Sequence, residues 1–271
     1  MANAAYASGF NTDALFVAAK AATVFAAHEQ SLFLGGGMIP VVNAPNGLLQ
    51  VPQLAAVTAV AITSEAGTGI DLDALLPADT KNTIQCDIYA ARSVLRDLGN
   101  IDPSEIGRVL GNAVSKKFDT AVIAAMEGLT ASTTDSDVID VDVIFDAVSQ
   151  IRGAGETGQL MGIISTANAA ALMKAIGTNA YGGGDFQGEA MRNGFLGQIA
   201  GVRLFQSSYV GAGDGKGFIF AADAMRIAMQ KNVDIETARR PEAVGQDIVA
   251  SLHAGVGVID ATRGVKLINV A

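Results

Sequence analysis

The chain has 271 residues, of which 50% are hydrophobic, 31 are glycine and only 17% are charged, with a formal net charge of −9. The lack of any basic run excludes nucleic-acid binding as the main activity, the single Cys86 excludes an internal disulfide framework, and no apolar run is long enough to span a membrane. So little charge favours a subunit with large permanent contacts, because obligate interfaces resemble a domain core.

The first segment, residues 1–34, is predicted to be a short arm followed by a helix. Asn11 or Thr12 can cap this helix. Its apolar side is expected to carry Leu15, Phe16, Ala19, Ala22, Phe25 and Ala26. The first residues lack the basic end and apolar centre of a signal peptide, so we expect synthesis in a reducing cytoplasm.

Residues 35 to about 79 are predicted to form a two-stranded excursion from the body of the protein. Three glycines, Gly35 to Gly37, suit a hinge at its base, and a turn is expected near Glu65–Gly69. Residues 82–97 alternate in polarity like the returning strand. A hairpin this long has no core of its own and needs a surface to lie on. The alternative is a β-rich subdomain folded against its own chain.

A long amphipathic helix is predicted from Pro103 to Gly128. Asp102 caps it, Pro103 supplies a fixed φ where no donor is needed, and Glu105 complements the helix dipole. The apolar positions are Ile106, Val109, Leu110, Ala113, Val114, Phe118, Ala121, Val122, Ala125 and Leu129. The opposite side is expected to carry Glu105, Arg108, Asn112, Lys116, Asp119 and Glu127. The apolar stripe turns around the helix, so its two ends should pack on different neighbours; an ordinary long helix of an α/β enzyme is the alternative.

The second half of the chain is predicted to begin with helices and to end in strands. A polar loop over residues 130–140 leads to a helix capped by Asp140 or Asp142, a buried strand at residues 161–164, and a helix over residues 167–176 capped by Ser165 or Thr166. A glycine-rich loop, residues 177–188, comes next. The strands are expected at residues 202–206, 218–221, 227–230, 233–237, 247–254, 255–259 and 265–270. This order favours an α+β fold over alternating βαβ units.

Motifs for catalysis or ligand binding are weak. Residues 153–158 match G-x-G-x-x-G, but they follow a helix and precede a strand, the reverse of the dinucleotide-binding context. Residues 211–216 have the wrong spacing for a phosphate loop, and a hairpin turn is expected there. His28 and His253 form no metal motif, and the aspartates of residues 135–142 lack the glycine and glutamate of a calcium loop. We therefore predict no catalytic, cofactor-binding or metal-binding residues.

The order of these parts and the closing stretch resemble the major capsid proteins of tailed bacteriophages, the Hong Kong 97 fold. The closing stretch reads Arg239-Arg240-Pro241-Glu242, then residues 245–251, residues 255–260 and Gly264-Val265, which are similar to the late strands and glycine-containing turn of that family. The resemblance implies the following parts: an N-arm and helix (1–34), an extended E-loop (35–85), a peripheral domain with the spine helix (86–152 and 233–271), and an axial domain (153–232).

The resemblance also implies a function, which is structural and not enzymatic. The chain would assemble into hexamers and pentamers of an icosahedral head around double-stranded DNA, with a scaffolding protein, a portal and a cement protein as further partners. It would be made in the host cytoplasm and end in the virion, away from membranes. Lys81 lies at the end of the excursion, so covalent cross-linking is not expected. The alternatives are an encapsulin-type nanocompartment shell and a cytosolic oligomeric enzyme.

Overall fold

A computed structural model describes residues 19–27, 31–34, 37–54, 79–96, 103–134, 139–178, 195–211 and 215–269. After a helix over residues 19–27, the elements are β1 (Val41–Asn43), β2 (Leu48–Leu54), β3 (Asp79–Gln85), β4 (Asp87–Arg96), α2 (Pro103–Met126), β5 (Thr130–Thr134), α3 (Val141–Gly153), β6 (Leu160–Ser165), α4 (Thr166–Thr178), β7 (Phe195–Ile199), β8 (Val202–Ser207), β9 (Gly215–Ala221), β10 (Met225–Arg240), η2 (Pro241–Ala243), β11 (Gly245–Val258), η3 (Ala261–Arg263) and β12 (Gly264–Asn269).

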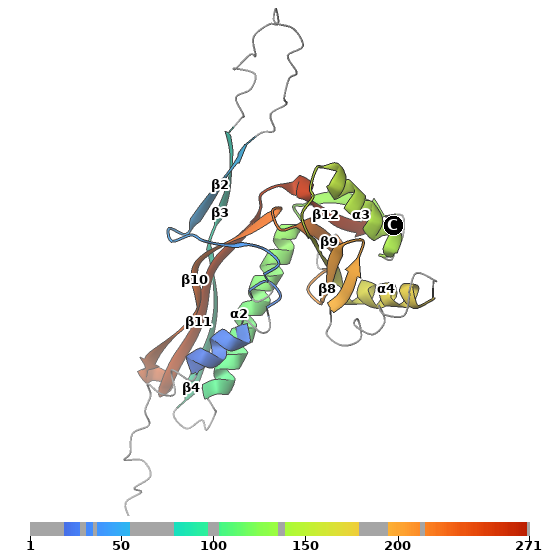
Figure 1. Ribbon diagram of the computed structural model, residues 1–271. Helices are drawn as coiled ribbons and strands as arrows, with labels where there is room; N and C mark the ends of the chain where they lie inside the picture. The colour runs from blue at the N-terminus through green and yellow to red at the C-terminus, as the bar shows by residue number, and fades with distance from the viewer. Residues whose placement is uncertain are drawn as a thin grey trace, which may run out of the picture.

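The strands form three sheets. One has four strands in the order β1-β10-β11-β4, one has six in the order β5-β12-β9-β6-β8-β7, and β2 and β3 pair as a separate ribbon. In Figure 1 the ribbon stands out from one end of the molecule, α2 runs along the four-stranded sheet, and the six-stranded sheet lies to the side with α3 and α4. The mixture of helices with sheets confirms the α+β prediction at this level.

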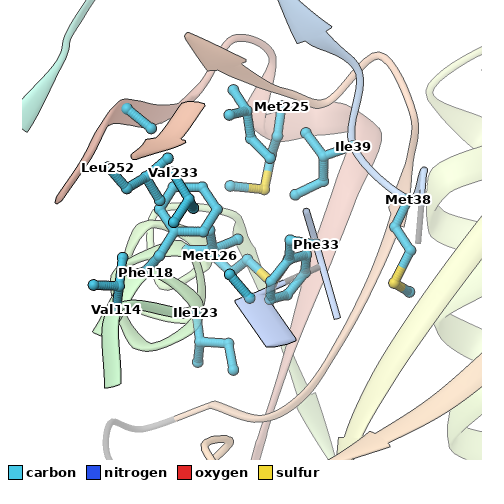
Figure 2. Packing of buried hydrophobic residues seen from close by; sticks show 14 of the residues in the cluster. Phe33, Met38, Ile39, Val114, Phe118, Ile123, Met126, Met225, Val233 and Leu252 are labelled. Atoms are coloured by element: carbon cyan, nitrogen blue, oxygen red, sulfur yellow. The ribbon is translucent and has the colours of Figure 1, made fainter. Parts of the chain in front are cut away.

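The long predicted helix is confirmed as α2, and its buried face turns along its length. One row of residues at four-residue steps is buried: Ile106, Leu110, Val114, Phe118, Val122 and Met126. Because four residues turn the helix by about 400°, each step moves this row by about 40°. Figure 2 shows Val114, Phe118 and Met126 in one cluster with Val233, Leu252 and Phe33. Asp102, the expected cap, lies outside the described residues.

Some positions of α2 do not lie where the apolar pattern placed them. Val109 is 66% exposed and Ala113 is also exposed, whereas Asp119, expected on the solvent side, is only 2% exposed. The reason is a second buried row that starts at Gly107 and Gly111 and faces the helix over residues 19–27. A three-to-four-residue pattern of large apolar residues does not reveal such a row, because its members are small or polar.

The second row lets two helices approach closely. A Cβ atom on Gly107 would lie 2.5 Å from the Ala19 carbonyl oxygen, and one on Gly111 would lie 2.5 Å from that of Thr23. The Thr23 hydroxyl donates to the Gly107 carbonyl at 2.9 Å. Phe25, expected on the apolar side of the first helix, is 67% exposed, because Ala19, Thr23, Ala26 and Ala27 are buried instead.

Three other expectations need correction. The polar loop at residues 130–140 begins with a strand, β5, which pairs in parallel with β12. The expected hairpin at residues 211–216 does not join neighbouring strands, because β6 lies between β8 and β9. The separate strands expected at residues 227–230 and 233–237 are parts of the single strand β10, and those expected at residues 247–254 and 255–259 belong to the single strand β11. Register shifts after Met229 explain the apparent break in β10.

The shorter helices begin where their caps predict. The Asp140 carboxylate accepts a hydrogen bond from the Val143 amide at 3.0 Å at the start of α3, and the Ser165 hydroxyl accepts one from the Asn168 amide at 3.2 Å at the start of α4. The expected buried strand is confirmed as β6. The N-terminal arm, the turn at Glu65–Gly69 and most of the loop at 177–188 lie outside the described residues.

Candidate interaction surface

The ribbon of β2 and β3 leaves the body of the protein with little support. The two strands pair in antiparallel register from Leu48 opposite Gln85 to Leu54 opposite Asp79, and no third strand joins them in the described part of the chain. Leu48 is 44% exposed and Ile84 is buried at 4%. A two-stranded ribbon is at best marginally stable in water unless it packs against another surface.

The base of the ribbon, in contrast, is fixed firmly to the body. Ile84 forms a small buried cluster with Ala44 and Ala228. The Asn82 side-chain amide donates to the Ile259 carbonyl at 2.6 Å. A Cβ atom on Gly257 would lie 2.8 Å from Cγ1 of Ile84, so glycine is needed for this close approach. The direction in which the ribbon leaves the body is therefore built into the fold.

A second feature of this surface is β4, which forms an edge of the four-stranded sheet. In the described residues β4 pairs with β11 alone. Ile88 is 66% exposed and Val94 is 39% exposed, whereas Tyr89 and Leu95, which alternate with them, pack toward α2. An edge strand with exposed apolar side chains can pair with or pack against another chain.

A buried carboxylate holds the segment that connects the first helix to the body. Asp119 of α2 accepts hydrogen bonds from the Ser31 hydroxyl at 2.5 Å and from the Leu32 amide at 3.1 Å. Burial raises the pKa of the Asp119 carboxyl from its ordinary value of 3.8 to about 6, against the opposing effect of the donors at Ser31, Leu32 and Phe33. Among the described residues no ion pair involves Asp119. The pKa of the nearby Tyr209 hydroxyl is raised mainly by burial and also by the negative charge of Asp119.

This buried charge predicts an unusual pH dependence of stability. The folded protein holds the Asp119 proton more tightly than the unfolded chain does. The contribution of this group to the free energy of unfolding is therefore fully present below about pH 4 and is lost as the pH rises through about 6. Asp119→Asn resembles the protonated carboxyl, since its Oδ1 can accept from the Leu32 amide while its Nδ2 donates to the Ser31 hydroxyl oxygen, so it should raise the free energy of unfolding at pH 7 by about 1–3 kcal/mol.

Urea unfolding between pH 4 and pH 8 checks this prediction about Asp119. The wild-type protein should lose stability across the lower part of that range relative to the Asn variant, and Asp146→Asn, which changes an exposed carboxylate of α3, serves as the matched control. Parallel pH profiles for the wild type and Asp119→Asn would contradict the assignment.

The residues considered for chemistry do not come together in the described part of the chain. His253 lies on β11 opposite Ile88 and Lys231, and His28 is outside the described residues. Asp140 caps α3, and residues 153–158 begin with the last residue of α3 and lead toward β6, the helix-to-strand context expected from the sequence. The described residues hold no group of three or more His, Cys, Asp or Glu placed to bind a metal ion. No described helix combines the length and apolar character needed to cross a membrane.

Comparison with known proteins identifies the fold. No protein-family model matches the sequence, and no curated protein matches it. The capsid structure of cyanophage P-SCSP1u shares 15% identity with a TM-score of 0.67 over 86% of each chain. A structure from Mycobacterium phage Che8 shares 18% identity with a TM-score of 0.66 over 82% of this chain and 84% of that one. A virus-like particle from Pyrococcus furiosus shares 14% identity with a TM-score of 0.65 over 93% and 98%. The chain therefore has the Hong Kong 97-like fold of tailed-bacteriophage capsid proteins.

Proposed function

We propose that this protein is the repeating structural subunit of an icosahedral head that encloses the double-stranded DNA of a tailed bacteriophage, and that it is not an enzyme. The observation that carries this proposal is the ribbon of β2 and β3, which packs on the body at its base and is joined by no third strand in the described part of the chain. In a chain with this fold, a second copy is the natural surface for the ribbon to lie on.

The other surface features support the same function. The chain has few charges, and β4 presents exposed apolar side chains along an edge that pairs with no other described strand. Contacts between copies would cover both, as obligate interfaces do. The net charge of −9 and the lack of a basic run suit a wall that surrounds DNA without binding it tightly.

The parts of the chain acquire roles in this proposal. Residues 1–34 act as the N-arm and helix, residues 35–85 as the E-loop, and α2 as the spine helix. The resemblance assigns residues 86–152 and 233–271 to the peripheral domain and residues 153–232 to the axial domain. The strand order favours moving β5 and β12 into the axial domain and the whole of β10 into the peripheral domain. The six-stranded sheet includes β5 and β12 and is covered by α3, which suits the axial domain, while β10 joins the four-stranded sheet of the peripheral domain from Met225 onward.

The partners of the protein also belong to the proposal. Further copies would form hexamers and pentamers, and a scaffolding protein, a portal and a cement protein would complete the head. The location would be the virion, after synthesis in the bacterial cytoplasm.

A second candidate is the shell of a nanocompartment that encloses a cargo protein. The similarity to the virus-like particle from Pyrococcus furiosus, which extends over 98% of that chain, keeps this candidate open because that structure is named as a virus-like particle and not as a phage. Both candidates require closed shells built from copies of one subunit, and they differ in what the shell contains.

Electron microscopy of the purified full-length chain tests the proposal. We expect closed shells, and shells from cells that replicate the parent phage should be large and filled with DNA. Small uniform shells that carry one co-purifying protein would instead support the nanocompartment. A discrete dimer or tetramer at high protein concentration, with a small ligand that raises its melting temperature, would overturn both in favour of an oligomeric enzyme.

A further inference from the structure

The four-stranded and six-stranded sheets are joined by two neighbouring chain segments, β9–β10 and β11–β12, which bend together between the sheets. β9 pairs with β12 in the six-stranded sheet, and the same two chain segments continue as β10 and β11, which pair in the four-stranded sheet. The bend therefore lies where residues 222–224 connect β9 to β10 and residues 259–263 connect β11 to β12. The Ala224 carbonyl accepts hydrogen bonds from the Ile259 amide at 2.8 Å and the Asp260 amide at 3.2 Å, which ties the two connections together.

A single guanidinium, that of Arg263, contacts carboxylates from three separate segments at this bend. Its Nη1 atom lies 3.2 Å from Oε2 of Glu156, in the connection between α3 and β6, and 3.7 Å from Oδ2 of Asp223, between β9 and β10. Its Nε atom donates to Asp260, between β11 and β12, at 3.1 Å. Planar guanidinium groups suit such bridging, because their donors point in fixed directions.

The partners of Arg263 are themselves held in place. Glu156 has a side chain only 10% exposed and accepts a bond from the Gly158 amide at 2.7 Å. Arg226 of β10 donates to the Ala222 carbonyl at 2.7 Å and to Asp223 at 2.6 Å, which fixes the turn before β10. The hydrogen bond from Arg226 also lowers the pKa of the Asp223 carboxyl, so this carboxylate stays charged near Arg263.

We infer that Arg263 and the carboxylates of Glu156, Asp223 and Asp260 form a clasp that sets the angle between the four-stranded and six-stranded sheets. Elsewhere the two sheets are joined by a shared hydrophobic cluster, which includes Phe218 and Phe220 of β9 together with Leu252 of β11, and by α2, which continues into β5. The clasp adds a polar attachment at the bend itself, from the connection between α3 and β6, and so restrains opening or twisting at residues 222–224 and 259–263. Arg263 acts here as a positioning residue.

The angle matters because of the proposed function, on which this part of the inference rests. Copies in pentamers and hexamers of one closed shell have different neighbours and different local curvature. A partly exposed ionic clasp can yield by small amounts, since each of its pairs is weak in water and screened by salt. It would thus allow the variation that a closed shell needs while keeping the mean curvature the same from copy to copy.

The angle can be measured in the unassembled full-length subunit, so this test does not depend on shell formation. With Cys86→Ser as background, spin labels at Ala238→Cys in β10 and Gln206→Cys in β8 report the distance between the two sheets; both positions are exposed. Double electron–electron resonance should give one narrow distance distribution for the unmodified clasp. Arg263→Met and Glu156→Gln should each broaden it.

Lys231→Met is the matched control, because it removes the same charge while Lys231 pairs only with Asp234 and Glu236 of its own strand among the described residues. It should leave the distribution narrow. A distribution for Arg263→Met that coincides with that of Lys231→Met would overturn the clasp. If Arg263→Met does not fold, the distance distribution of Glu156→Gln is compared with that of Lys231→Met instead, because Gln keeps the size of the side chain.

A shell-assembly experiment then tests the proposed role in curvature separately from the clasp itself. If the wild type assembles and Arg263→Met gives shells of mixed diameter, the inference holds in full. If shells of the variant keep a uniform wild-type diameter, the role in curvature is wrong even where the distance distribution broadens. If the wild type itself forms no shells, the proposed function fails, and the distance measurement still stands by itself.

Discussion

Removal of the ribbon should abolish shell formation while leaving the subunit folded. The variant deletes residues 52–81 and joins Val51 to Asn82 by an Asn-Gly turn, which suits a two-residue hairpin connection. The deletion keeps the pairs at the base and the bond from Asn82 to the Ile259 carbonyl. Because the deletion keeps Ile84 and Leu49, which pack in the small cluster at the base, the loss of stability should be small. Electron microscopy and size-exclusion chromatography should show subunits or single rings in place of closed shells.

The control for this deletion is the fold of the variant itself. Its far-ultraviolet circular dichroism and its melting temperature should remain close to those of the wild type, apart from the missing strands. Closed shells of normal size from a variant with an intact fold would show that the ribbon lies on its own chain, and the assignment of residues 35–85 as an intersubunit loop would have to be withdrawn.

Val114→Asp should prevent folding altogether. Val114 is 1% exposed and lies in the middle of α2, within the cluster that contains Phe118 and Leu252. Burying a carboxylate there without a partner costs several kcal/mol, which is comparable with the roughly 5–15 kcal/mol that stabilises a whole domain. The expected result is insoluble protein, or soluble protein without a cooperative thermal transition.

Ala113→Asp provides a matched control for Val114→Asp. Ala113 precedes Val114 in the same helix and is exposed, so the same new charge should lower the free energy of unfolding by only about 1 kcal/mol or less, mainly through the lower helix propensity of Asp. A soluble, native-like Val114→Asp variant would contradict the packing of α2, and an unfolded Ala113→Asp variant would show that the charge disturbs the helix itself.

The sequence predicts α2 well because both its start and its face depend on local chemistry. Proline at the first position and apolar residues four apart are sufficient to place the helix and its large buried row. The same holds for α3 and α4, whose caps, Asp140 and Ser165, lie next to the helices that they begin. Features that depend on short stretches of chain were therefore predictable.

Features that depend on residues far away in the chain could not be predicted from the sequence. Asp119 looks like a surface residue, and only the hydroxyl of Ser31, 88 residues earlier in the chain, gives its carboxylate a buried place. β5 contains threonine, serine and alanine and reads as a loop until β12, from the far end of the chain, pairs with it. The spacing of Gly107, Gly111 and Ser115 was a usable signal of close helix packing, because small residues at four-residue steps let another backbone approach.

The candidate surface was predictable in part for the same reason. Prolines and glycines in residues 35–85 indicated an excursion, and the pairing of β2 with β3 agrees with that expectation. The exposed edge at β4 and the clasp around Arg263 were not predicted, since both arise from sheet order and from side chains of three segments that meet at the bend.

The long pairing of β10 with β11, from Met225 opposite Val258 to Arg240 opposite Gly245, has a mechanical consequence. Their ladder of hydrogen bonds is perpendicular to the strands, so a pull along the strand axes strains many of these bonds together in shear and does not open them one by one. Bending at residues 222–224 and 259–263 strains far fewer hydrogen bonds. A wall made of this chain would therefore resist stretching by pressurised contents more strongly than it resists flexing.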